Sequence, residues 1–459
     1  MKSVRSSFSV RLPACVARFA RLATLAVGLV AATAATAEVP KVQRVVSPGG
    51  LEAWLMQYSD APLITMQLSF PGGTLQDPDG KYGTAGMAAY LFDEGAGPYD
   101  SPELLRRRTR IGVRLIASTG AEYFNVAFAT PTMSKDEGFE LLRLALHQPR
   151  FDEEPMTRGR TAALANIQAS QKNPGSIASL ALNSSMYGNH PFATDWPART
   201  AGYKSVGYDD VAAFRRRVLA RDTVKISVAG DIDAATLAPL LDRLLGALPA
   251  KAELRPLPAP SGTPGGCKVI TMDVPQAQVL FAAVTPALTW EQRRAERVLN
   301  SILNGEGRLF EEVRAKRGLV YSVGTSFSHY KTFSHFGGSF AAGIDDVPEA
   351  LRVTMAELRR MAAEGPTEEE VATVRRAFVG SYLLGLDTGE ALVGQMSDFQ
   401  IFGRPTTFLD DTAGEIEKIT RDDVWEVAKL LLNPDRFTVT IIAPPTEAKL
   451  CDVVAPQRP

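Results

Sequence analysis

Two side chains in the C-terminal half of the sequence have the chemistry of a carbonyl-binding pair. They lie in the segment GRLFEEVRAKRGLVYSVGTSFSHY, residues 307–330, where we expect a helix to end at Gly318 and a strand to begin at Val320. Arg314 falls in the last helical turn and Tyr321 just inside the strand, so the guanidinium and the phenol can meet. Such a pair binds peptide carbonyl groups or stabilises an oxyanion. The structural alternative is a capping arginine beside a core tyrosine.

Other patterns with catalytic potential are weak. The acidic pair Asp93 and Glu94 is adjacent in sequence, so the two carboxylates point apart. No nucleophile elbow and no phosphate-binding glycine loop occurs. The four histidines are His147, His190, His329 and His335, and none has an H-x-x-E-H neighbourhood. We expect a structural loop role for His190, and hydrogen-bonded surface or core positions rather than metal binding for His329 and His335.

An internal repeat determines the architecture that must position these residues. Residues 203–230 and 416–444 both read as Asp-Asp-Val opening an amphipathic helix, then a turn, then an alternating strand. Asp210 and Asp423 mark equivalent positions. Upstream, residues 151–167 and 366–382 both read as helix starts with acidic first turns, at almost the same offset. Two matches at nearly one offset predict two homologous halves.

The halves are expected to be α+β domains, each a mainly antiparallel sheet packed by helices on one side. Strands are predicted at residues 64–70, 125–131, 279–284 and 337–343, and helices at 136–148 and 346–365. Residues 249–266 are rich in proline and glycine, which is typical of a linker. The predicted organisation is a leader over 1–37, an N-terminal domain over 38–248, this linker, and a C-terminal domain over 267–459.

The first 37 residues have the features of a secretory signal peptide. Five basic residues precede and flank an apolar run over residues 22–37 that ends in Ala-Thr-Ala, and the first acidic residue is Glu38. A mitochondrial transit peptide is the rival, but a transit peptide is amphipathic, whereas this run is continuously apolar. We therefore expect a periplasmic protein with no membrane attachment after cleavage.

Charge and cysteine content restrict the partners and the compartment. Cleavage lowers Lys+Arg from 50 to 45 against 51 acidic residues, which disfavours nucleic acid as a partner. Cys267 and Cys451 remain in the mature chain. They could pair in an oxidising compartment or stay as two free thiols, and the sequence leaves both possibilities open.

Residues 307–330 closely resemble the second-domain signature of the M16 zinc peptidases. The segment MYGNHPFATD, residues 186–195, is similar to a first-domain segment of the same family. The duplicated halves, the linker and the mature length fit the half-size M16B type. In this family an arginine and a tyrosine with the spacing of Arg314 and Tyr321 engage the substrate backbone near the zinc.

The resemblance also shows what this sequence lacks. M16 enzymes carry H-x-x-E-H on a first-domain helix, where two histidines bind zinc and the glutamate is the general base. That motif falls on GTAGMAAYLFDEGA, residues 83–96, so Gly86 and Tyr90 replace the histidines and Ala89 replaces the glutamate. The distal glutamate ligand falls near Asn166. None of these side chains is a good zinc ligand.

The resemblance therefore implies a non-catalytic subunit that keeps Arg314 and Tyr321 and binds no zinc. Its partner would be a zinc-competent M16 chain in a heterodimeric peptidase. The substrates would be unfolded peptides held as an added β-strand. The alternatives are a structural M16-like subunit and a homodimeric peptide-binding module without chemistry.

Overall fold

A computed structural model describes residues 41–452, apart from 258, 261, 263–264, 385–387 and 447–448. The predicted signal peptide lies outside these residues. No helix in the described part of the chain has both the length and the apolar character that a membrane span requires.

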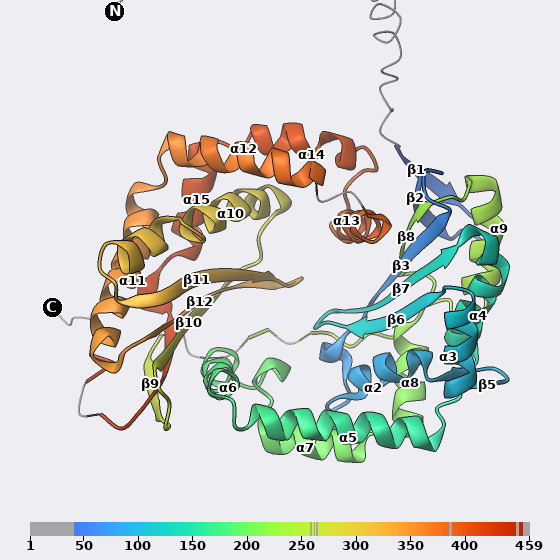
Figure 1. The fold of residues 1–459 in the computed structure, drawn as a ribbon, viewed down its shortest axis with the longest axis horizontal. Coiled ribbons are helices and arrows are strands. Elements are labelled where there is room, and N and C mark those ends of the chain that lie inside the picture. The colour runs from blue at the N-terminus through green and yellow to red at the C-terminus, as the bar shows by residue number, and fades with distance from the viewer. Residues whose placement is uncertain are drawn as a thin grey trace, which may run out of the picture. The chain divides into compact units, whose positions relative to one another are not determined.

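The described residues form two α+β halves (Figure 1). The strands of the first half are β1 (Val42–Val46), β2 (Glu52–Gln57), β3 (Leu63–Pro71), β6 (Arg114–Thr119), β7 (Tyr123–Pro131) and β8 (Lys225–Gly230), with the short pair β4 (Gly95–Ala96) and β5 (Tyr99–Asp100). Its helices are α2 (Thr84–Tyr90), α3 (Ser101–Arg110), α4 (Lys135–His147), α5 (Glu153–Ser170), α6 (Pro174–Tyr187), α7 (Trp196–Ser205), α8 (Tyr208–Val218) and α9 (Ala234–Leu245).

The second half repeats this order. Its strands are β9 (Cys267–Thr271), β10 (Ala277–Pro286), β11 (Val320–His329), β12 (Phe333–Ala342) and β13 (Thr438–Ala443). Its helices are α10 (Trp290–Leu303), the short π-helix η6 (Phe310–Ala315), α11 (Val347–Glu364), α12 (Glu368–Leu384), α13 (Gly389–Ile401), α14 (Phe408–Glu417) and α15 (Arg421–Leu431).

The strand orders confirm the predicted duplication. The first sheet runs β1-β2-β8-β3-β7-β6 and the second runs β9-β13-β10-β12-β11, so each strand from β2 onward has a counterpart. Both sheets are antiparallel except for one parallel pair in each, β2 with β8 and β9 with β13. The strands and helices predicted for both halves are all present. The edge strands β6 and β11 occupy equivalent places.

The repeated Asp-Asp-Val segments have a capping function that explains their recurrence. In α8 the carboxylate of Asp210 accepts the N–H of Gly207 at 2.8 Å, and in α15 Asp423 accepts the N–H of Thr420 at 2.8 Å. The second aspartate therefore satisfies an N–H at the start of each helix, as an acidic residue in a capping box does. The repeat thus preserves the N-terminal cap of the helix that comes before the last strand of each half in the sequence, β8 or β13.

The helices of each half cover one face of its own sheet. The first core packs α2, α4, α8 and α9 against the strands, and the second packs α10, α11 and α15. This arrangement confirms the predicted packing on one side. The opposite faces show a feature that the sequence did not indicate, because each receives a helix from the other half.

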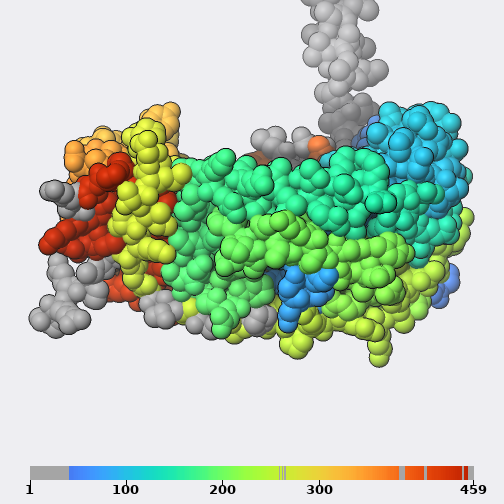
Figure 2. Space-filling model, turned by 90° about the horizontal axis from the view of Figure 1, so that it is seen from below, coloured from blue at the N-terminus to red at the C-terminus, as the bar shows by residue number. Residues whose placement is uncertain are grey.

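Helix α13 of the second half lies on the first sheet, and α6 of the first half lies on the second (Figure 1). Leu392, Val393, Met396 and Phe399 of α13 are buried against Trp54 and Met56, and Ser397 Oγ lies 2.8 Å from Ser69 Oγ. In return, α6 buries Ala178, Leu182 and Met186 against β10, β13 and their neighbours. Figure 2 shows the α5–α7 region, in teal to green, extending to the yellow segment of the second half.

Candidate functional site

A cavity of about 2020 Å³ separates the two halves, and both halves line it. The first half contributes residues of α5, α6 and α7, including Asn166, Tyr187 and Tyr203. The second half contributes residues of β10, β11 and β12. A cavity of this size exceeds what a small-molecule ligand needs, and it is large enough for a peptide segment.

Arg314 and Tyr321 lie together, as their spacing predicts. The guanidinium carbon of Arg314 is 4.9 Å from the centre of the Tyr321 ring and 4.9 Å from the centre of the Phe310 ring. Gly318 adopts φ +67° and donates its N–H to the carbonyl of Arg314 at 2.8 Å, which ends the helix and turns the chain into β11. Single-turn π-helices such as η6 are frequent at functional sites.

The exposure of Tyr321 excludes the core-tyrosine alternative. This residue is 76% exposed, whereas a core tyrosine would be buried. Neither Tyr321 nor Arg314 is among the described residues that line the cavity, although Ser322, the next residue of β11, is one of them. The pair therefore lies beside the cavity, on the surface.

Gly86, in the position of the first zinc-binding histidine, lies beneath a tyrosine. A Cβ atom placed on Gly86 would lie 2.9 Å from the hydroxyl oxygen of Tyr203, whose ring also packs over Gly83. Burial raises the pKa of the Tyr203 phenol to about 12, so the hydroxyl stays protonated and neutral. Tyr203 from α7 therefore fills the space into which the histidine side chain would extend.

Tyr90, in the position of the second histidine, belongs to an arginine network. Arg158 donates from Nε to the hydroxyl of Tyr90 at 2.9 Å and from Nη2 to Glu94 at 2.6 Å, and it also pairs with Glu154. The Tyr90 hydroxyl is thus bound by a guanidinium whose charge Glu94 and Glu154 balance, and a neutral phenol held in this way is a poor zinc ligand.

The remaining two positions also lack a metal ligand. Ala89 is buried and has no polar side-chain atom, and Asn166 lines the cavity from α5. The described residues contain no group of three or more His, Cys, Asp or Glu side chains placed to hold a metal ion. The residues present at the zinc position of the family do not fit zinc.

We expect the purified mature chain to hold no stoichiometric zinc, because the ligand positions carry Gly86, Tyr90 and Asn166. The measurement is metal analysis after incubation with zinc and gel filtration, with a zinc-binding M16 enzyme as the positive control. One tightly held zinc ion per chain would contradict the alignment of the motif.

A double-mutant cycle tests whether Tyr203 occupies the space above Gly86. In a Tyr203→Phe background, Gly86→Ala should raise the free energy of unfolding by about 1 kcal/mol, because alanine is the better helix former. In the wild-type background the hydroxyl crowds the new methyl group, and the gain should be lost. Denaturant unfolding measures both effects, and equal effects in the two backgrounds would show that the hydroxyl does not crowd position 86.

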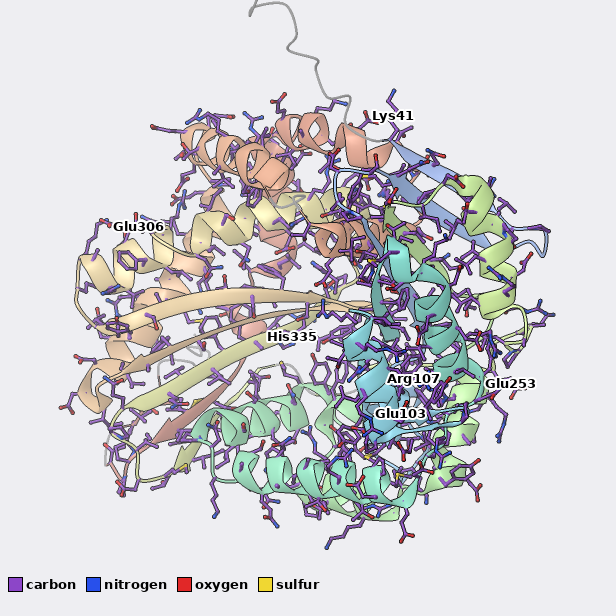
Figure 3. The ribbon with its side chains drawn as sticks, turned by 45° about the vertical axis from the view of Figure 1, so that its right-hand side comes forward. Lys41, Glu103, Arg107, Glu253, Glu306 and His335 are labelled. Atoms are coloured by element: carbon purple, nitrogen blue, oxygen red, sulfur yellow. A yellow bond between two sulfur atoms is a disulfide. The ribbon has the colours of Figure 1, made fainter. Side chains whose placement is uncertain are left out.

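The histidines have the structural roles expected from the sequence, with one addition. His190 is buried, and its Nδ1 accepts the N–H of Phe192. His329 Nε2 lies 3.1 Å from Glu296. His190 also lines the cavity, and so does His335 from β12, a placement that sequence reasoning missed (Figure 3). The signal was the segment HFGGSFAA, residues 335–342, whose alternation places His335 among small residues on one side of the strand.

The two homologous α+β halves define a duplicated two-domain protein with a cavity that both halves line. A family model described as "Insulinase (Peptidase family M16)" matches residues 55–196, and one described as "Peptidase M16 inactive domain" matches residues 205–378. The chain belongs to the M16 peptidase family.

Relatives and solved structures agree with this assignment. The chain is 25% identical over 431 residues to an uncharacterized zinc protease of Streptomyces coelicolor, covering 90% of this chain and 93% of that one. It is 22% identical over 390 residues to a protein of Helicobacter pylori described as a non-peptidase homolog, covering 83% and 89%. A peptidase M16 inactive domain structure from Pseudomonas fluorescens superposes with a TM-score of 0.82 at 21% identity, covering 89% of this chain and 99% of that one.

Proposed function

We propose that this chain is the non-catalytic, substrate-binding subunit of a heterodimeric M16 zinc peptidase. It supplies Arg314 and Tyr321 to the zinc site of a partner chain that carries an intact H-x-x-E-H motif. The observation that carries the proposal is the exposed pair: Tyr321 is 76% exposed and stacked beside Arg314, in a chain whose own zinc positions do not fit zinc. An exposed pair is accessible to another subunit.

The roles of the two side chains follow from their chemistry. Zinc held by the partner would supply Lewis-acid activation of the scissile carbonyl and of water. Tyr321 donates its phenol hydrogen to the oxyanion that develops on that carbonyl, and Arg314 holds a neighbouring carbonyl of the substrate with its guanidinium. The stacking of Arg314 on Tyr321 orients both groups before the substrate arrives.

Unfolded peptides are the proposed substrates. The edge strand β11 has one neighbour in the sheet, β12, and several of its residues line the cavity. The outer edge of such a strand can pair with an extended peptide through main-chain hydrogen bonds, except at Thr325, whose N–H and carbonyl are bound by the side chain of Asn304. This mode favours chains without stable structure of their own.

Export to the periplasm is part of the proposal. Cys267 and Cys451 form a disulfide with their Cα atoms 5.6 Å apart, which answers the question that the sequence left open. Disulfides persist in oxidising compartments, so this bond supports the predicted signal peptide. A solved structure with a TM-score of 0.78, at 15% identity, is a periplasmic protease of Escherichia coli.

The test is purification of the tagged chain from its native host, with identification of the proteins that accompany it and a peptidase assay. We expect a zinc-containing M16 chain to co-purify and the complex, but not either subunit alone, to cleave unstructured peptides. A complex without peptidase activity would assign the chain to a structural role. A homodimer that binds peptides without a partner would overturn the heterodimer.

A further inference from the structure

On β11 and β12, the side of the second sheet that faces the cavity carries mainly small, uncharged side chains, whereas on β10 the same side also carries Leu280 and Gln278. Residues paired directly across two strands point to the same side of a sheet. Ser326 of β11 pairs with Gly337 of β12, and Ser328 pairs with His335. Two further pairs, Gly324 with Ser339 and Ala282 with Gly337, extend the same side. We call this surface the serine face, defined by its cavity-lining residues Ser326, Ser328, His335, Gly337 and Ser339.

The opposite side of the same strands shows how different the serine face is. Phe336 and Phe340 of β12 alternate with the small residues and are buried in the core of the second half. Ser326 and Ser339 are exposed, and their hydroxyls make no hydrogen bond within the described part of the chain. The serine face therefore offers unpaired hydroxyl groups. Because its side chains are short, a peptide main chain can approach the strands closely.

His335 adds a directed hydrogen-bond donor to this surface. The hydroxyl of Tyr187, from α6, lies 2.8 Å from His335 Nδ1. Burial lowers the pKa of His335 to about 4, so the imidazole is neutral at neutral pH. Burial also raises the pKa of the Tyr187 phenol above its ordinary value, so the phenol keeps its proton. The phenol therefore donates to Nδ1, and the imidazole proton resides on Nε2.

The Nδ1–H tautomer of His335 would leave more hydrogen-bonding groups without a partner. If Nδ1 donated to Tyr187, the phenol proton would have no acceptor among the described residues, and Nε2 would be an acceptor. We assign the Nε2–H tautomer on this hydrogen-bonding argument.

Gly337 keeps this donor accessible. A Cβ atom on Gly337 would lie 2.9 Å from His335 Nε2. The missing side chain at position 337 is what leaves room for an acceptor beside the Nε2–H group. His335 and Gly337 thus work as a unit, in which one supplies the donor and the other leaves its approach open.

We propose that the serine face is a peptide subsite that recognises the main chain of an extended segment, with His335 Nε2–H donating to a peptide carbonyl. The segment should carry small, uncharged side chains, such as Gly, Ala or Ser, on its sheet-facing side. This inference rests on the proposed function, because it takes a peptide as the ligand. It adds a binding site that is separate from Arg314 and Tyr321.

The experiment uses the full mature chain and two fluorescein-labelled nonapeptides, one of alternating Gly and Ala and one with Glu at every second position. Fluorescence polarisation should show tighter binding of the Gly-Ala peptide. Gly337→Ala should weaken that binding about fivefold to tenfold, because its methyl group blocks Nε2–H and removes one hydrogen bond. His329→Gln, on the same hairpin but outside the cavity lining, should bind as the wild type does.

Nitrogen NMR of the histidine rings gives a second readout that does not depend on affinity. His335 should show the Nε2–H tautomer in the free chain, with the proton-bearing nitrogen shifting when the Gly-Ala peptide is added. Tyr187→Phe should remove the tautomer preference. A chain in which His335 carries its proton on Nδ1, or in which Gly337→Ala binds the peptide as the wild type does, overturns the subsite. Equal affinity for the Glu peptide overturns the predicted selectivity.

These outcomes separate the subsite from the proposed function. Weaker peptide binding in Gly337→Ala, together with unchanged turnover in a Tyr321→Phe complex, would keep the subsite and reject the catalytic role of the pair. Unchanged peptide binding in Gly337→Ala, together with reduced turnover in the Tyr321→Phe complex, would support the catalytic role of the pair and reject the subsite.

Discussion

Tyr321→Phe, combined with a wild-type zinc-competent partner, is expected to lower kcat about 10²–10³-fold while the complex still assembles. The loss corresponds to removal of one donor to the developing oxyanion. Because Tyr321 is 76% exposed, the loss of its hydroxyl should leave the thermal midpoint of the chain unchanged. The measurements are steady-state peptide hydrolysis and thermal unfolding on the same preparation.

The matched control is Tyr208→Phe, because Tyr208 is also exposed, at 54%, and lies on α8, away from the cavity lining. This control complex should turn over peptides at the wild-type rate. If the Tyr321→Phe and Tyr208→Phe complexes share the wild-type kcat, the pair has no catalytic role and the chain is a scaffold.

Removing the disulfide is expected to cost about 2–5 kcal/mol of folding stability, the usual range for a native disulfide. Cys267 and Cys451 are 184 residues apart in sequence, so the bond constrains nearly the whole second half in the unfolded state. The double variant Cys267→Ser/Cys451→Ser should unfold at a lower denaturant concentration than the oxidised wild type.

A reductant distinguishes loss of the bond from loss of packing by the two side chains. Dithiothreitol should bring the wild type down to the stability of the double variant and leave the double variant itself unchanged. Equal stability of the oxidised wild type and the double variant would mean that buried Leu450 anchors the C-terminal segment without the bond.

Local patterns in the sequence were sufficient to predict the repeated elements. The Asp-Asp-Val segments could be recognised because a helix cap and its following strand are encoded within about thirty consecutive residues. The meeting of Arg314 and Tyr321 could be predicted for the same reason, since Gly318 sets the turn between them. The replacement of the zinc-binding histidines could also be recognised from the sequence, because the H-x-x-E-H motif spans only a few residues of one helix.

The contacts that the sequence did not reveal join residues far apart in the chain. Tyr203 over Gly86 and Tyr187 beside His335 both depend on the tertiary placement of α7 and α6. Periodicity identifies the apolar side of a helix but not the sheet that it covers, so the placement of α6 and α13 could not be predicted. The pairing of the two cysteines could not be predicted, because no sequence pattern near Cys451 indicates that this residue lies beside β9.

The reciprocal placement of α6 and α13 bears on how such a chain arose. A half that lacked its partner would leave Trp54 and Met56, or the corresponding side of the second sheet, uncovered. An ancestral single half would therefore have been a twofold-symmetric dimer in which each copy lent one helix to the other. Gene fusion would then have made that exchange intramolecular. The two halves, produced today as separate chains, should still associate on mixing, and gel filtration showing two monomers would argue against this origin.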